Sequence, residues 1–112
     1  MNNIKLLGRL TATPEIKYGA NGRAYAAFTL AVPRRSNRDE ADFIHCMAFD
    51  KLASALGTHC GKGRQILLDG RLEITRTQPQ GAPKPVYYSN VIANTLTFLH
   101  DPNRQQAAPA PA

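Results

Sequence analysis

The chain has 112 residues, 43% of them hydrophobic, which fits one folded domain and excludes a wholly disordered protein. Its 14 lysines and arginines against 8 acidic residues give a formal net charge of +6, so nucleic acid and anionic membrane surfaces lead the list of partners. On charge alone a basic protein that is merely soluble remains an alternative, and the lack of any apolar run of signal-peptide or transmembrane length predicts a cytoplasmic protein without membrane insertion.

The first part of the chain predicts two strands. Residues 4–10 form a short apolar run around Gly8, and a glycine within a strand often marks a bulge or a sharp bend. The run could resume briefly over residues 15–18, before a glycine-rich turn. Residues 23–32 alternate with period two, which predicts a strand whose face through Phe28 belongs to the core.

A third strand is predicted at residues 43–49, after a charged loop. Alternate side chains of a strand share a face. One face should therefore carry Phe43, His45, Met47 and Phe49, and the other Ile44, Cys46 and Ala48. Asp50 is a good N-cap residue, and the helical spacing of apolar side chains that follows predicts a short helix over residues 51–60.

The rest of the chain predicts two more strands. Residues 65–74 contain Gly70, and a loop rich in proline and glycine leads to a long alternating strand at residues 86–99. Because neighbouring residues of a strand face opposite ways, one of Tyr87 and Tyr88 should be exposed.

This order of elements predicts an all-β fold. Five strands with one short helix between strands 3 and 4 match the five-stranded Greek-key OB-fold barrel, although other small β barrels are compatible with the same order. We expect residues 1–101 to form this domain. Residues 102–112 lack large apolar side chains and are expected to form a flexible tail rich in proline, alanine and glutamine.

Nothing in the sequence predicts catalysis, a cofactor or a metal site. It has no glycine-rich phosphate loop, and neither Ser54 nor Ser89 lies in a nucleophile motif. The acidic cluster at residues 39–42 falls on a predicted loop. Cys46 and Cys60 lack CxxC spacing, which favours reduced, half-buried thiols over zinc ligands.

Positive side chains and rings occur together in this sequence. A protein that binds single strands without sequence preference needs cations for phosphates and flat rings for bases. Phe43 and Phe49 lie about 20 Å apart along the predicted strand at about 3.3 Å per residue, with His45 between them. Spacing alone leaves open whether these rings are stacking platforms or core. The nearby cations are Arg34, Arg35, Arg38, Arg71, Arg76 and Lys84.

Five ordered motifs resemble those of bacterial single-stranded DNA-binding proteins. They are NIKLLGRL at residues 3–10, PEIKY at 14–18 with Asn21-Gly22, FTLAV at 28–32, ADFIHC at 41–46 with FDKLA at 49–53, and Lys62-Gly63 with DGRL at 69–72. The likeness covers about residues 2–100 with about the family's spacing, so it is more specific than any one motif.

The resemblance implies an OB-fold protomer, usually a homotetramer, that wraps single-stranded DNA in replication, recombination and repair. It implies that Phe43 and Phe49 match stacking positions and that Lys51 matches the basic residue after them. The residues expected to contact DNA are Phe43, Phe49, His45, Lys51, Arg34, Arg35, Arg71, Arg76 and Tyr87.

The sequence departs from the family pattern in three ways. Tryptophan is absent, and the aromatic positions after strands 2 and 4 fall near Ser36 and Thr77. The acidic, phenylalanine-ended tip of the family is missing, so recruitment of protein partners through such a tip is not expected of this chain. Either the sequence is a truncated form of a longer protein, or it is a short variant from a phage, a mobile element or a paralogue.

Two rival functions remain open at this point. One is an OB-fold module that docks a replication or recombination protein and binds DNA only weakly. The other is RNA binding in the manner of cold-shock barrels.

Overall fold

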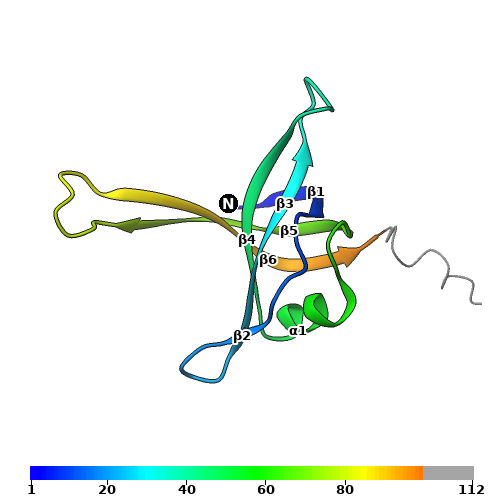
Figure 1. Ribbon diagram of the computed structural model, residues 1–112, viewed down its shortest axis with the longest axis horizontal. Coiled ribbons are helices and arrows are strands. Elements are labelled where there is room, and N and C mark those ends of the chain that lie inside the picture. Colours follow the sequence, from blue (N-terminus) through cyan, green and yellow to red (C-terminus); the bar gives the residue numbers. More distant parts are fainter. Residues whose placement is uncertain (100–112) are drawn as a thin grey trace, which may run out of the picture.

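The computed structural model describes residues 1–99, which form six strands and one helix, and the helix lies at one end of the strands (Figure 1). In chain order the elements are β1 (Ile4–Leu10), β2 (Lys17–Tyr18), β3 (Ala24–Pro33), β4 (Ala41–Phe49), α1 (Asp50–His59), β5 (Gln65–Thr77) and β6 (Val86–Phe98). The predicted all-β class with a single short helix before the penultimate strand is confirmed. The tail predicted for residues 102–112 lies outside the described residues.

Five strands close into a barrel. Hydrogen-bonded neighbours follow the order β1–β5–β6–β4–β3–β2, and β1 also pairs with β3. This last pairing closes a ring of five long strands, and the two-residue β2 is added beside β3. The arrangement agrees with the predicted five-stranded OB-type barrel. The resumed strand expected over residues 15–18 is shorter than predicted and keeps only Lys17–Tyr18.

The barrel closes where β1 comes close to β3 at Gly8. β1 pairs with β5 over residues 4–9 and with β3 at Arg9 and Leu10. A Cβ atom added at Gly8 would lie 2.7 Å from the carbonyl oxygen of Ala31, which is closer than real Cβ atoms approach. The strand glycine noted in the sequence therefore serves the tight contact that closure requires.

The inner side chains of the strands form one apolar core. Phe28 is buried, as its place in the alternating pattern predicted, and α1 adds Ala53 and Leu56 from the helix. The largest fully buried side chains are Leu30, Leu56, Ile66, Leu68, Val91 and Cys46. Burial of this apolar surface is what holds the sheet and the helix together.

Cys46 and Cys60 are both reduced, and both are buried rather than half-buried as predicted. Burial raises the pKa of the Cys46 thiol to about 12, because desolvation disfavours the thiolate. A thiol in this state is a packing residue and not a nucleophile.

The prediction that Asp50 caps the helix was wrong. Phe49 is the N-cap residue, and no side chain caps it by a hydrogen bond. Asp50 is the first helical residue and has a φ of 55°, in the left-handed region. Its carboxylate instead accepts hydrogen bonds from Nε of Arg23, with its oxygens at 3.1 and 3.0 Å. Arg23, in the turn just before β3, thus takes the oxygen atoms that a cap would use.

Two hairpins project from the barrel as arms (Figure 1). One consists of the far ends of β3 and β4 with the loop between them, and the other of the far ends of β5 and β6. β5 continues three residues past its predicted end at Ile74, because its backbone stays paired with β6 as far as Thr77 and Val86. Residues 71–81 are all exposed, so the usual apolar alternation could not mark this part of the strand.

A β-bulge at Asp69 and Gly70 lies where β5 leaves the barrel. A Cβ atom at Gly70 would overlap the carbonyl oxygen of Ile92 on β6. The bend predicted from this glycine therefore has a steric basis, since only glycine allows the two backbones to come this close.

Gly70→Ala should destabilise the protein by about 1–3 kcal/mol, since the added methyl group forces the β5 and β6 backbones apart. Chemical denaturation followed by circular dichroism measures the change. Gly61→Ala is the matched control, because its Cβ would meet only Thr13 Oγ1 at 3.7 Å and no unusual φ is needed there. Equal stability of the two variants would contradict the steric role of Gly70.

Candidate nucleic-acid interface

The two faces of β4 differ as the alternation predicted. Cys46 and Ala48 point into the core, and Ile44 packs against it. Phe43 and His45 are exposed on the outer face, and the Phe43 side chain is 66% exposed. A large apolar ring left in water on an ordered strand is available to a planar partner.

Phe49, at the other end of the same face, is half-buried and already has a partner. The guanidinium carbon of Arg23 lies 4.6 Å from the centre of the Phe49 ring, a cation–π distance. The Arg23–Asp50 ion pair holds the guanidinium there at 3.0 Å. A base can reach this face of Phe49 only if Arg23 moves. Sequence reasoning missed Arg23, because the β3–β4 register that aligns Tyr25 with Phe49 was not known.

A hollow of about 480 Å³ opens between the two arms. β4 and β6 pair in parallel only at Cys46 with Val91 and at Met47 with Ile92, and the strands diverge on the side of their N-terminal ends (Figure 1). We call this hollow the fork. Its lining residues are Phe43, Ile44, His45, Tyr87, Tyr88, Ser89 and Asn90.

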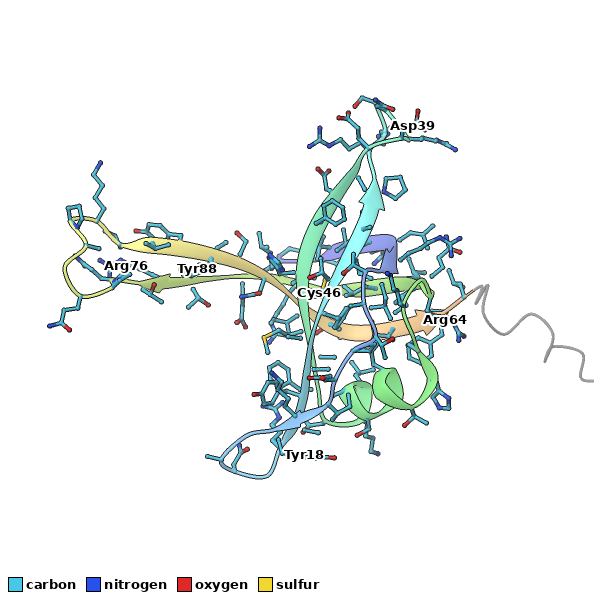
Figure 2. All side chains as sticks on the ribbon, viewed as in Figure 1. Tyr18, Asp39, Cys46, Arg64, Arg76 and Tyr88 are labelled. Atoms are coloured by element: carbon cyan, nitrogen blue, oxygen red, sulfur yellow. The ribbon has the colours of Figure 1, made fainter. Side chains whose placement is uncertain are left out.

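Both tyrosines of β6 are exposed, although only one was expected to be. The side chains of Tyr87 and Tyr88 are 61% and 53% exposed, because this part of the arm lies beyond the barrel and has no core on either face (Figure 2). Register separates the two residues. Tyr87 pairs with Arg76 of β5. Tyr88 shares a face of β6 with Ile92, because alternate side chains of a strand point the same way. Ile92 in turn pairs with Met47, which lies on the Phe43 face of β4. Tyr88, which the sequence did not single out, is thus the tyrosine on the outer face.

Some of the predicted cations have acidic partners. Nε of Arg34 lies 2.9 Å from the carboxylate of Asp42, and both side chains are about half exposed. Arg71 lies 3.3 Å from Glu73 and also donates to the side-chain oxygen of Asn94 at 3.1 Å. Exposed ion pairs of this kind hold their partners weakly, so both arginines could exchange a carboxylate for a phosphate.

Other predicted cations are without an acidic partner among residues 1–99. Arg35 lines a second hollow of about 400 Å³ together with Leu7, Pro33, Arg34 and Arg38. Arg76 lies on the β5–β6 arm, as Figure 2 shows, and Lys51 is the second residue of α1, two positions after Phe49. The predicted cations therefore lie on both arms and at the start of α1. They do not cluster at one point.

His45 lies between the two rings, as expected from alternation. Its Nδ1 atom is 3.3 Å from the hydroxyl oxygen of Thr29, the residue opposite it on β3. This contact fixes the imidazole against the sheet and leaves it beside the fork.

An ion pair links β1 to β5 at the base of the β5–β6 arm. The Nζ atom of Lys5 lies 2.9 Å from the carboxylate of Asp69, and the amide of Asn3 donates to the same group at 3.0 Å. These hydrogen bonds, with Lys5 the larger cause, lower the pKa of Asp69 below its ordinary value of 3.8.

Comparison with known proteins decides the family. The model of the Single-strand binding protein family matches residues 1–99. The chain belongs to this family. The resemblance seen in the sequence motifs is thereby confirmed, and residues 1–99 of this family member include the whole of the barrel and both arms.

Curated relatives of this single-strand binding family member come from several bacteria. A Single-stranded DNA-binding protein of Fusobacterium nucleatum subsp. nucleatum is 42% identical over 88% of this chain and 66% of its own length. One from Clostridium perfringens is 38% identical over 92% of this chain and 69% of its own. Single-stranded DNA-binding protein A of Bacillus subtilis is 38% identical over 92% and 62%. The chain thus spans about two thirds of the length of these relatives.

Within residues 1–99, no helix has the length and apolar character that crossing a membrane requires. The same residues contain no group of three or more histidine, cysteine or acidic side chains placed to hold a metal ion.

Asp69→Asn should reduce stability near neutral pH and matter less in acid. A carboxylate whose pKa is lowered by folding stabilises the fold above its unfolded-state pKa, and this contribution is lost as the pH falls through the folded-state pKa. The gap between the melting temperatures of variant and wild type should therefore be widest near neutral pH and should close as the pH falls below 3.8, the ordinary pKa of an aspartate. Asp39→Asn, on the exposed β3–β4 loop, is the control. A gap that stays constant over this range would contradict the role of Asp69.

Proposed function

We propose that the protein binds single-stranded DNA with little sequence preference and catalyses no reaction on it. The observation that carries the proposal is the 66% exposure of Phe43 on the outer face of β4, in the middle of a surface with cations on both arms. Membership of the single-strand binding family and the names of its bacterial relatives support the same function.

The chemistry of the surface suits an unpaired strand. Stacking of one base on an aromatic ring contributes about 1–3 kcal/mol and tolerates any base. Phe43 offers a free ring, and Phe49 offers one when Arg23 moves aside. Basic side chains lie around these rings and along both arms, where phosphates would pass. They are Arg34, Arg35, Arg71, Arg76, Lys51 and His45. Tyr87 lies with Arg76 on the opposite face of the β5–β6 arm and would meet a strand that wraps around it.

The cellular role follows from this binding. A protein that covers unpaired strands protects them during replication, recombination and repair. We place this action in the bacterial cytoplasm, on chromosomal, phage or mobile-element DNA, since the relatives are bacterial.

A protein-docking module is the second candidate. Leu72 and Ile74 are 41% and 54% exposed on the same face of the β5–β6 arm as Tyr87, and exposed apolar residues of this kind favour a protein partner. This function predicts weak binding of oligo-dT together with capture of a protein partner after nuclease treatment.

Titration of labelled oligo-dT, followed by fluorescence anisotropy at several salt concentrations, tests DNA binding. The slope of log K against log salt should be about −0.7 for each phosphate that a cation neutralises. Replacing both Phe43 and Phe49 by alanine should weaken binding by about 2–6 kcal/mol if two bases stack. Circular dichroism must show that the variant is folded, because Phe49 is half-buried.

Tyr18→Ala is the matched control, since Tyr18 is 69% exposed but lies off the Phe43 face. Binding that ignores salt, that prefers duplex DNA, or that survives the double substitution unchanged counts against the proposal. Binding of oligo-U at least as tight as that of oligo-dT would favour the RNA alternative.

We further propose that four protomers associate. Leu7 and Leu67 are directly paired on β1 and β5, and their side chains are 46% and 40% exposed, so the two strands present apolar surface outside the barrel. Light scattering should give four protomers per particle, with and without oligo-dT. Leu7→Lys should yield smaller particles, because it places a charge in the interface, whereas Thr58→Lys on α1 should not. A wild-type monomer at micromolar concentration would refute the association.

A further inference from the structure

The fork brings together exposed rings that come from different arms, and two of them share the outer face. Phe43 projects from β4, and Tyr88 projects from β6 on the side that register assigns to the same outer face. The two residues are 40 or more positions apart in the chain, and both line the hollow of about 480 Å³. The fork is therefore a product of the tertiary fold and not of one strand.

Packing does not explain the exposure of Tyr88. Its side chain is 53% exposed, its cross-strand partner Thr75 is exposed as well, and within residues 1–99 its hydroxyl makes no hydrogen bond. An amphipathic ring held on a paired strand without a structural partner is available to a ligand.

The lining of the fork favours a nucleobase. The walls are aromatic, and the side chains of His45, Ser89 and Asn90 supply polar groups at the edges. No acidic residue lines the hollow. A base has apolar faces and hydrogen-bonding edges, so it matches both features, and the cations of the two arms suit the phosphates on either side of it.

We propose that Tyr88 forms, together with Phe43, a base-binding subsite in the fork. One base of the strand enters the hollow, stacks on Phe43 from the β4 side and contacts the Tyr88 ring from the β6 side. The strand then crosses from one arm to the other at this point and does not follow β4 alone. The subsite rests on the proposed function, because its ligand is a base of single-stranded DNA.

Tyr88→Ala should weaken oligo-dT binding about 5- to 150-fold, which is the loss of one stacked base at about 1–3 kcal/mol. Tyr88→Phe should keep near wild-type affinity, because the ring and not the hydroxyl carries the contact. Tyr87→Ala should cost less, because Tyr87 borders the hollow but alternation directs its ring to the other face of the arm. Tyr18→Ala again serves as the control for loss of an exposed ring.

A double-mutant cycle tests whether the two rings share a base. If they do, Phe43→Ala and Tyr88→Ala together should cost less than the product of their separate fold-losses. Fully independent losses would assign the rings to different bases and would overturn the shared subsite.

Photo-cross-linking gives a readout that does not depend on affinity. An oligo-dU that carries 5-iodouracil is irradiated with the wild-type protein, and the adducts are mapped by mass spectrometry. Adducts are expected at Tyr88 and Phe43, and adducts confined to other residues would overturn the subsite.

The outcomes separate the two proposals. If Tyr88→Ala binds like wild type while Phe43→Ala binds weakly, the fork subsite is wrong and DNA binding stands. If the wild-type protein fails to bind oligo-dT at all, the proposed function itself is wrong.

Discussion

The position of every candidate contact depends on the burial of one face of β4. Cys46 and Ala48 are sealed in the barrel between β3 and β6, and both are small enough to fit there. A slip of one residue would turn Phe43 and His45 into the core and Cys46 into water, which the hydrophobic effect opposes. The inner face thus fixes the outer one, and Phe43 keeps its place although it is largely exposed.

Local patterns predicted most of the barrel. β1 has the bounds that its apolar run indicated, and the buried position of Phe28 and the exposed position of Phe43 follow from period-two alternation. Gly8 indicated the close contact between β1 and β3, and Gly70 indicated the bulge. Both features need a residue without a Cβ atom. These features are encoded within a few residues of one another, so a single sequence suffices to find them.

Features that depend on long-range register could not be predicted. The pairing of Met47 with Ile92 joins segments far apart in the chain, and it alone shows that Tyr88 and not Tyr87 shares a face with Phe43. The place of Arg23 over Phe49 and the unusual φ of Asp50 have the same origin, since they arise where β3 meets the start of α1. The far half of the β5–β6 arm has no buried face, so hydrophobic alternation could not predict where β5 ends.

The depth of Cys46 also governs how the barrel responds to oxidants. Burial raises the pKa of this thiol to about 12, so the thiolate is scarce at neutral pH, and sulfenic acid or a mixed disulfide forms through the thiolate. Oxidative stress therefore cannot readily add a bulky group beneath the β4 surface.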